Sequence, residues 1–439
     1  MKLEGAKVVV IGMARSGVAA AELLRSKGAF VRAVDQNPVN VPGFEVQPQT
    51  NAALADADLI VLSPGVPADL DIVEERRRKG VKVIGDLELA SWFLRGEIIG
   101  ITGSNGKTTT TALTGHILKA SGIPMQVGGN IGTPPAGMVD TSKDGQWNVL
   151  ELSSFQLETT ESLRAHIAAA LNVTPDHLDR HYTLERYAAA KARLFVNQRA
   201  GDGKVLNADD AACRDYASVG PGSPVWFSST HDVSRGAFLR EGRLYLDDEP
   251  LMPASEVPLR GMHNLENAMA AAAMARLAGA THAQIRDAVM TFPGVEHRLE
   301  FVREVGGVAW YNDSKATNVD ATLNAIAAFD GGLWVILGGK DKNSDYAPLA
   351  APLSEKARGV LLIGAAAEKI DAHLRGAGPA RSGEAAILMC RTLDAAVAAA
   401  HDRAKPGETV LLAPACASFD QFENFEHRGR EFKRLVKEL

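Results

Sequence analysis

Residues 98–108 read Ile-Ile-Gly-Ile-Thr-Gly-Ser-Asn-Gly-Lys-Thr, and this stretch decides the fold of the middle of the chain. The apolar run from Glu97 to Thr102 predicts a buried strand, and a Gly-rich turn leads from it into a helix opening on Lys107. Such a turn cradles phosphates, because its glycines let backbone N–H groups converge and the helix N-terminus adds partial positive charge. The Lys107 amine would reach the outer phosphates and the Thr108 hydroxyl would hold Mg²⁺. The stretch therefore predicts a nucleoside triphosphate site.

The loop departs from the strict eight-residue phosphate-loop pattern at one position, where Ile101 stands in place of a glycine. The glycines nearest to Ile101 in the stretch are Gly100 before it and Gly103 after it. An ordinary strand-to-helix turn is the alternative. Gly106, Lys107 and Thr108 directly after a strand favour a variant phosphate loop.

Composition limits the class of protein. A chain of 439 residues suggests about three domains at roughly 150 residues each. Hydrophobic residues make up 46% and charged residues 23%, as in an ordinary globular protein. The formal net charge of −6 argues against a nucleic-acid partner, whereas a small anionic ligand needs only a local positive site. Cys213, Cys390 and Cys416 lack metal spacing and are interpreted as buried thiols in a reducing cytosol.

The N-terminus shows no signal peptide. Residues 1–5 lead straight into a short strand, without the pattern of a signal peptide. No apolar run reaches the ~18 residues that cross a bilayer. We therefore expect a cytoplasmic monomer without a membrane partner.

The first ninety residues predict the opening of a doubly wound nucleotide-binding fold. Residues 7–12 give a buried strand, a Gly-rich turn opens a helix, and a second strand ends at Asp35. The dinucleotide fingerprint is incomplete, because Ala14 replaces the middle glycine that lets backbone approach a pyrophosphate. This disfavours NAD. A turn carrying Arg15 and Ser16 could bind a different diphosphate through its side chains.

Two further strand ends would face the phosphate loop. The strand ending at Glu151 would deliver its carboxylate to the same sheet edge, as a candidate Mg²⁺ ligand or a solvated cap. A strand from Ile167 to Val173 leads into residues 174–179, Thr-Pro-Asp-His-Leu-Asp, a loop composition typical of active sites. His177 is thus an active-site candidate or a surface histidine. Lys191 lies in an Ala-rich helix, and helix propensity alone accounts for it.

The remainder of the chain predicts a β-rich excursion and a third α/β unit. Short strand patterns occupy residues 204–259, and Asn264 and Asn267 then share one face of a helix, where they could cap it or contact a base. Strand patterns recur between residues 333 and 412. The predicted fold class is α/β with three domains: a Rossmann-like domain (1–90), a central P-loop ATPase-like domain with a mostly parallel sheet (91–291) and a C-terminal Rossmann-like domain (292–439).

Three α/β domains with one phosphate loop indicate a ligase or kinase that gathers several ligands, since a pure NTPase would need only the middle domain. The chain resembles the Mur ligases of bacterial cell-wall synthesis over its whole length, and within that family the D-glutamate-adding branch. Ile101 is the family's own form of the loop. The Asp-Asn-Pro-Arg motif of the branch that adds diaminopimelate or lysine is not found. The resemblance rests on residues 102–109, 151–157, 174–181, 261–264, 297–298, 312–318 and 415–422.

The resemblance implies a reaction between three small molecules. ATP would transfer its γ-phosphate to the carboxylate of UDP-N-acetylmuramoyl-L-alanine, giving an acyl phosphate. The amine of D-glutamate would then attack, giving a tetrahedral intermediate and an amide.

The resemblance also implies roles for individual residues. Catalytic roles fall on Lys107, His177 and Lys191. ATP contacts fall on Gly103, Ser104, Asn105, Gly106, Lys107, Thr108, Thr109, Asn264, Asn267, Arg298 and Asp313. Contacts to the UDP-linked substrate fall on Ser16, Asp35, Ser63, Gly65, Asn130 and His177. D-glutamate contacts fall on Lys315, Thr317, Lys342, Ser418 and Phe425. Two Mg²⁺ sites fall on Thr108 with Glu151 and on His177 with Lys191, where Lys191 would be carbamylated.

Two alternatives stay open at this point. A folylpolyglutamate-synthase-type ligase uses the same loop chemistry but needs a pterin site in place of the UDP-binding domain. The other alternative is a non-catalytic protein that binds a UDP-sugar or NAD. Asp35 is followed by Gln36 and Asn37 rather than by the basic residue often found there, which puts the uracil contact in doubt.

Overall fold

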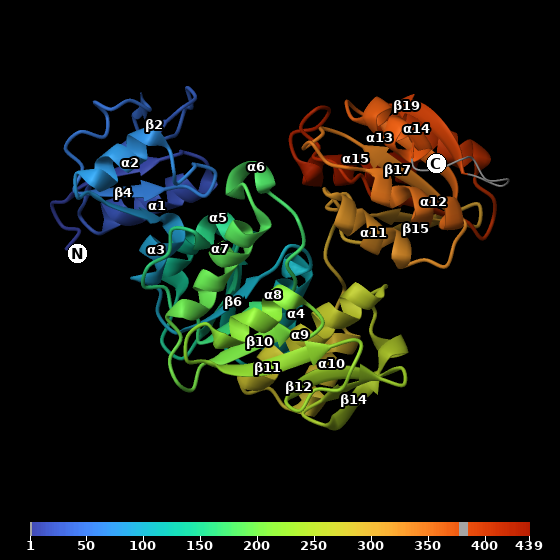
Figure 1. Cartoon of the computed structure of the whole chain (residues 1–439), viewed down its shortest axis with the longest axis horizontal. Helices are drawn as coiled ribbons and strands as arrows, with labels where there is room; N and C mark the ends of the chain where they lie inside the picture. The colour runs from blue at the N-terminus through green and yellow to red at the C-terminus, as the bar shows by residue number, and fades with distance from the viewer. Residues whose placement is uncertain (1, 377–384) are drawn as a thin grey trace. The chain divides into compact units, whose positions relative to one another are not determined.

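Buried strands separated by Ala-rich helices build three mostly parallel sheets. The computed structural model, drawn in Figure 1, describes residues 2–376 and 385–439. The chain divides into two compact units, one of Met1–Val257 with Glu266–Phe292 and one of Pro258–Leu265 with Pro293–Leu439. Helix α9 (Met262–Leu277) therefore begins in the second unit and continues in the first.

The first unit contains two of the sheets. The N-terminal sheet is parallel, with the order β3-β2-β1-β4-β5. This order matches the first five strands of a doubly wound fold, whose opening the sequence predicted. Its elements are β1 (Lys7–Ile11), β2 (Phe30–Asp35), β3 (Val46–Pro48), β4 (Leu59–Leu62), β5 (Lys82–Gly85), α1 (Arg15–Ser26), α2 (Asp71–Arg78) and α3 (Asp86–Ser91).

The central sheet has nine strands in the order β14-β13-β12-β11-β10-β9-β6-β8-β7. Its strands are β6 (Glu97–Thr102), β7 (Met125–Gly129), β8 (Trp147–Glu151), β9 (Ile167–Ala170), β10 (Gly203–Asn207), β11 (Ser223–Ser228), β12 (Gly236–Arg240), β13 (Arg243–Leu246) and β14 (Glu249–Pro253). Its helices, besides α9, are α4 (Lys107–Ala120), α5 (Ser154–Leu157), α6 (Leu178–His181), α7 (Leu184–Val196), α8 (Ala211–Asp215) and α10 (His282–Met290).

The strands beyond residue 200 extend this sheet instead of forming a separate excursion. β10 pairs with β9 in parallel, β11 and β12 follow in parallel, and only β13 and β14 turn back antiparallel. The predicted strand from Ile167 to Val173 is also shorter, since β9 ends at Ala170. Its last residues instead form the loop on which the phosphate loop rests.

The second unit carries a six-stranded sheet in the order β15-β16-β20-β17-β18-β19, drawn in orange to red in Figure 1. β15 and β16 pair antiparallel as a hairpin, and the other pairs are parallel. Its elements are β15 (Glu300–Val305), β16 (Val308–Asn312), β17 (Leu333–Gly338), β18 (Ala357–Ile363), β19 (Ala386–Arg391), β20 (Thr409–Leu412), α11 (Val319–Ala327), α12 (Ala350–Lys356), α13 (Ala367–Gly376), α14 (Leu393–Arg403) and α15 (Phe425–Glu438).

Register places the phosphate loop at a shared edge of the central sheet. β6 lies between β8 and β9 and is parallel to both, with Ile101 opposite Glu151 and Thr102 opposite Ala170. Ile101 is fully buried, which accounts for an apolar residue there: it is the end of the strand, not part of the turn. The loops after all three strands therefore leave the sheet side by side.

Gly106 makes the turn from β6 into α4. It has φ +83°, a left-handed conformation that suits glycine, and a Cβ there would lie 2.3 Å from Asn267 Oδ1. The side chain of Asn267 thus closes over the start of α4, which no sequence pattern indicated.

Asp86, the first residue of α3, is a buried acid. Burial raises its pKa to about 7, and the Leu87 N–H and the Ser16 hydroxyl offset this only in part. The pKa of Asp86 is higher in the folded protein than in the unfolded chain. At low pH the carboxyl is neutral in both states and costs no stability. As the pH rises toward 7, stability is lost because the unfolded chain ionises more readily.

Asp86→Asn removes this titration. We expect the stability of the variant relative to the natural protein to rise by up to about 1.4 kcal/mol per pH unit below about pH 7 and to level off above it. Unfolding temperatures measured from about pH 5.5 to about pH 8.5 check this. Asp71→Asn, at an exposed acid of the first turn of α2, is the control. A stability difference that does not depend on pH would contradict the assignment.

Candidate active site

The phosphate loop is fastened to the loop after β9. Ser104 N–H donates to the Asn172 carbonyl oxygen (2.9 Å), and Asn105 N–H donates to Asn172 Oδ1 (2.8 Å). The Ser104 hydroxyl donates to the Thr174 carbonyl oxygen and accepts from Thr174 N–H, both at 2.9 Å. These bonds hold the loop open as a rigid cradle, and they connect it directly to the segment that carries His177.

Glu151 forms the polar floor beside the loop. Its carboxylate is buried, accepts from the Thr108 hydroxyl at 2.7 Å and from Asn130 Nδ2 at 2.8 Å. A carboxylate and a hydroxyl next to a phosphate cradle are the hard oxygen ligands that Mg²⁺ uses with nucleotides. The donor set fits the predicted Mg²⁺ position, and Asn130 is brought to the same place.

Two lysines converge on one carbonyl of the loop. Lys107 Nζ donates to the carbonyl oxygens of Gly103 (2.7 Å) and Ser104 (2.8 Å), and Lys191 Nζ donates to that of Gly103 (2.9 Å). Lys191 is 1% exposed, and its amine lies 4.3 Å from the ring centroid of Tyr187. Burial, and secondly the charge of Lys107, lower the pKa of Lys191 well below its usual value, while Asp176 opposes the shift. This lysine is not a solvated helix residue.

His177 lies in the next loop with strained backbone, at φ +54°. Its ring meets that of Phe155 edge-on, with 4.8 Å between the ring centroids, and lies 6.4 Å from that of Tyr187. Asp176 Oδ2 is 3.6 Å from its Nε2. Strain at a non-glycine residue is common where function fixes a side chain. Within residues 2–376 and 385–439, no cluster of three or more His, Cys, Asp or Glu side chains suits a metal. The second Mg²⁺ site stays a prediction.

The residues predicted for the UDP-linked substrate gather at the carboxyl edge of the N-terminal sheet. Ser16 begins α1 after β1, Asp35 ends β2, and Ser63 follows β4, so their strands are neighbours. The Asp35 carboxylate accepts from Met13 N–H (2.7 Å) and Asn37 N–H (2.9 Å), and thereby shapes the turn after β1.

The same edge is joined to the Asn130 segment. The Arg15 guanidinium donates to the carbonyl oxygen of Gly132. The turn that replaces the dinucleotide fingerprint thus reaches the central sheet through a side chain, and the two groups of candidate substrate residues adjoin within the first unit. Gly65 lies in the exposed turn after β4.

In the second unit, candidate D-glutamate residues collect at the ends of β16, β17 and β20, which are neighbours in the sheet. Lys315 Nζ lies 4.9 Å from the ring centroid of Phe425, and Thr317 N–H donates to the Lys315 carbonyl oxygen. Ser418 follows β20 and is buried, whereas Lys342 follows β17 and is exposed.

Buried Arg428 holds these three strand-end loops together and carries no sequence signal, because α15 reads as a charged surface helix. Its guanidinium donates to the Ser314 hydroxyl (2.9 Å). It also donates to the carbonyl oxygens of Ser314, Cys416, Ala417 and Gly338. Burial lowers its pKa to about 10, with Cys416 and Asp420 opposing, so it stays charged near neutral pH. A cation tied to backbone carbonyls fixes the loops without a carboxylate partner.

The remaining candidates for ATP binding divide between the units. Asn267, in the first unit, accepts from the Thr110 hydroxyl (3.1 Å), and Thr109 is buried beside it in α4. In the second unit, Asn264 Nδ2 donates to the Arg260 carbonyl oxygen (2.7 Å). Asp313 is buried there, which raises its pKa to about 6, and Arg298 opposes this shift.

Comparison with known proteins identifies the family of this chain. Three family models match it: "Mur ligase MurD-like, N-terminal domain" at residues 6–85, "Mur ligase middle domain" at 101–275 and "Mur ligase, glutamate ligase domain" at 297–416. The chain belongs to the Mur ligase family.

Relatives named UDP-N-acetylmuramoylalanine--D-glutamate ligase extend over the full length of this Mur ligase. That of Solibacter usitatus is 58% identical, covering 100% of this chain and 99% of the relative. That of Acidobacterium capsulatum is 50% identical over 99% of this chain and 97% of the relative.

Solved structures share the fold of this Mur ligase. The UDP-N-acetylmuramate-alanine ligase MurC of Thermotoga maritima has a TM-score of 0.63 at 19% identity and covers 99% of both chains. The family models and this likeness confirm the predicted α/β class with three domains. The boundaries 1–90, 91–291 and 292–439 stay predictions.

Lys107→Ala tests the phosphate loop. We expect ligase turnover to fall about 10²- to 10³-fold with the fold intact, as when one charge-stabilising group is removed from other active sites. Steady-state ADP release measures the turnover, and far-UV circular dichroism shows whether the fold is intact. Lys119→Ala, at the exposed last turn of α4, should leave turnover unchanged. Near-normal turnover of Lys107→Ala would remove Lys107 from the site.

Proposed function

We propose that this Mur ligase joins D-glutamate to UDP-N-acetylmuramoyl-L-alanine at the expense of ATP. It is an ATP-dependent ligase of peptidoglycan precursor synthesis. The observation that carries the specific reaction is the full-length identity of up to 58% to relatives named for it. The built phosphate cradle and the loop-bearing second sheet agree with that assignment.

The reaction proceeds in two covalent steps. A carboxylate oxygen of the L-alanyl group attacks the γ-phosphorus, the bond to the β,γ-bridging oxygen breaks, and ADP leaves with the electron pair. The D-glutamate nitrogen then attacks the acyl carbon and gives a tetrahedral intermediate. Its C–O bond to phosphate breaks, the nitrogen loses a proton, and the amide and inorganic phosphate remain.

The residues of the first unit supply position and charge. Lys107 moves from the loop carbonyls to the transferring phosphate, where its charge offsets that of the equatorial oxygens. Thr108 and Glu151 would hold one Mg²⁺, and His177 with Lys191 would hold a second. When bound, these ions neutralise phosphate charge and orient the oxygens.

Lys191 becomes a ligand by carbamylation. An amine binds CO₂ only when unprotonated, and the lowered pKa of Lys191 favours that form. Its nitrogen forms a bond to the carbon of CO₂ and releases a proton, and the product is a carboxylate. The change converts a repelled cation beside Lys107 into an anionic partner.

The other residues contact three ligands: ATP, the UDP-linked substrate and D-glutamate. Asn264, Asn267, Arg298 and Asp313 contact the nucleoside and phosphates of ATP. Ser16, Asp35, Ser63, Gly65, Asn130 and His177 contact the UDP-linked substrate. Lys315, Thr317, Lys342, Ser418 and Phe425 contact D-glutamate, whose two carboxylates suit the lysines.

We also infer a monomer that acts in the cytoplasm on small molecules alone. None of the helices that the structure describes is long and apolar enough to span a bilayer. A folylpolyglutamate-type ligase is disfavoured by the MurD-like model over residues 6–85, where a pterin site would have to stand.

ADP release with varied substrates tests the function. We expect release only when UDP-N-acetylmuramoyl-L-alanine and D-glutamate are both present, with little from L-glutamate, and none from a folate with glutamate. Release with the folate would favour the folylpolyglutamate alternative. Nucleotide binding without substrate-dependent ADP release would indicate a non-catalytic protein.

A further inference from the structure

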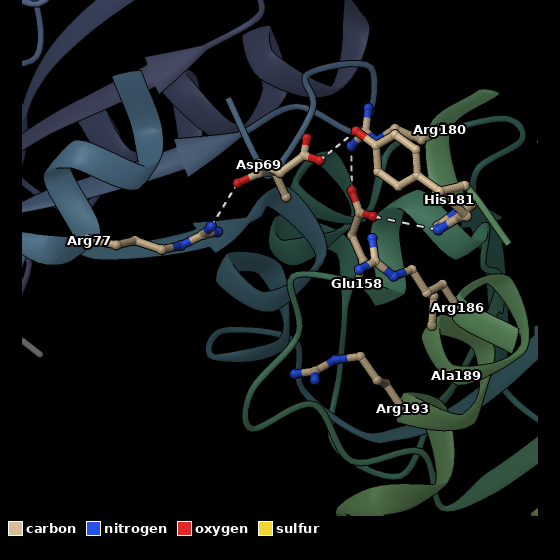
Figure 2. A pocket seen from close by; sticks show the side chains of 11 residues that line it. Asp69, Arg77, Glu158, Arg180, His181, Arg186, Ala189 and Arg193 are labelled. Atoms are coloured by element: carbon tan, nitrogen blue, oxygen red, sulfur yellow. Dashed lines mark hydrogen bonds and ion pairs between the residues drawn. The ribbon is translucent and has the colours of Figure 1, made fainter. Parts of the chain in front are cut away.

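A cavity of about 470 Å³ in the first unit is bordered by none of the phosphate-loop residues 103–109, and four arginines line it (Figure 2). Arg77 comes from α2 of the N-terminal part, Arg180 from α6, and Arg186 and Arg193 from α7. The remaining lining residues are Ala68, Asp69, Glu158, His181, Tyr182, Ala189 and Ala190. We call it the arginine cavity. Such a cluster stands out in a chain of net charge −6.

The acids of the cavity already have partners. Glu158 accepts from Arg180, whose guanidinium also donates to the Val66 carbonyl oxygen (2.9 Å). Asp69 accepts from the Tyr182 hydroxyl at 2.8 Å. His181 adds no charge near neutral pH, because burial and then the charge of Arg180 lower its pKa to about 4.

Positive charge is left over on the α7 side. Arg193 Nε donates to the Leu157 carbonyl oxygen (3.1 Å), and a terminal nitrogen donates to that of Thr160. These bonds to neutral groups fix the guanidinium without balancing its charge. The Arg186 side chain has no hydrogen bond or ion pair to any residue the structure describes, and lies 5.5 Å from the ring centroid of Tyr182.

Arg77 faces them from the other wall. It donates to the Ala68 carbonyl oxygen at 2.7 Å and pairs with Glu74 on its own helix. Each guanidinium has five N–H donors, so all three arginines keep donors for a ligand. Among the described residues Arg186 and Arg193 have no carboxylate partner, and Asp69, whose partner is the neutral Tyr182 hydroxyl, offsets one of these two charges. One positive charge and several N–H donors remain for an anion.

We propose that the arginine cavity binds a phosphate-type anion, either inorganic phosphate or the phosphate group of a monoester. Arg77, Arg186 and Arg193 hold it, because the planar guanidinium fork matches two phosphate oxygens at once. Nothing in the proposed ligase reaction uses these three side chains. The site is thus additional to the ATP and substrate contacts.

Binding there ties two parts of the first unit together. Helix α2 belongs to the N-terminal sheet and α7 to the central sheet. An anion bound by arginines of both helices replaces the repulsion between those arginines with attraction to a shared ligand. Two faces of helix α7 carry these groups. Arg186 and Arg193 lie on one face, whereas Tyr187 and Lys191, four residues apart, lie on the other. An anion on the outer face therefore steadies the helix that positions Lys191.

Phosphate titration in the presence of saturating ADP and Mg²⁺, which occupy the phosphate loop, tests the site. Isothermal titration calorimetry at constant ionic strength measures the affinity, and glycerol phosphate in place of inorganic phosphate separates the two sources of the ligand. We expect one site per chain. Arg186→Gln should weaken it by about tenfold or more, because a charge-assisted contact is lost without breaking any internal hydrogen bond. Arg77→Gln, on the opposite wall, should do the same.

Arg78→Gln is the matched control, since Arg78 is exposed on α2 next to Arg77 and does not line the cavity. It should bind phosphate as the natural protein does. Phosphate should also raise the unfolding temperature of the natural protein and of Arg78→Gln but not of Arg186→Gln. Equal affinity in Arg186→Gln and the natural protein, or no binding at tens of millimolar phosphate, would overturn the proposal. Neither result would bear on the ligase activity, which is measured separately.

Discussion

Two lysine amines on one backbone carbonyl, that of Gly103, set the constraint around which the first unit is arranged. Lys107 and Lys191 approach that oxygen at 2.7 and 2.9 Å, and burial gives Lys191 little water with which to screen the repulsion. The conflict is relieved if Lys191 gives up its proton. Burial and the charge of Lys107 lower the pKa of Lys191, which favours the unprotonated amine that the proposed carbamylation requires. The carbamate would be attracted to Lys107, whereas the protonated amine is repelled by it.

Parallel register brings these groups to one edge. β6 lies between β8 and β9, so Glu151, the phosphate loop and the His177 loop leave the sheet together. The second unit uses the same geometry at β16, β20 and β17, with Arg428 bonded to the backbone of all three following loops. In both units a buried basic side chain donates to backbone carbonyl oxygens. Beside Lys191 a second cation, Lys107, adds to the effect of burial in lowering the pKa, whereas Cys416 and Asp420 oppose the effect of burial on Arg428.

Local sequence patterns were enough to predict most of the fold. Buried strand runs predicted β1, β2, β6 and β8, and the Gly-Lys-Thr turn predicted the phosphate loop. The sequence does not say which strands share a sheet, so β10 to β14 read as a separate excursion, although they pair onto β9. Burial is equally hidden when a long charged side chain is involved. Lys191 in an Ala-rich helix and Arg428 in a charged one both look solvated, and only tertiary packing puts them in the interior. The arginine cavity joins α2 to α7, more than a hundred residues later, and no local pattern marks it.

The state of Lys191 is the most direct test of this account. A ¹³C NMR spectrum of the protein in ¹³C-bicarbonate buffer should contain a carbamate carbonyl resonance, present in the natural protein and in Lys119→Ala. It should be missing from Lys191→Arg. Lys107→Met should weaken it or shift its pH dependence upward, because the charge that adds to burial in lowering the pKa of Lys191 is gone. A natural protein with no carbamate resonance, and a Lys191→Arg variant with full turnover, would contradict the account.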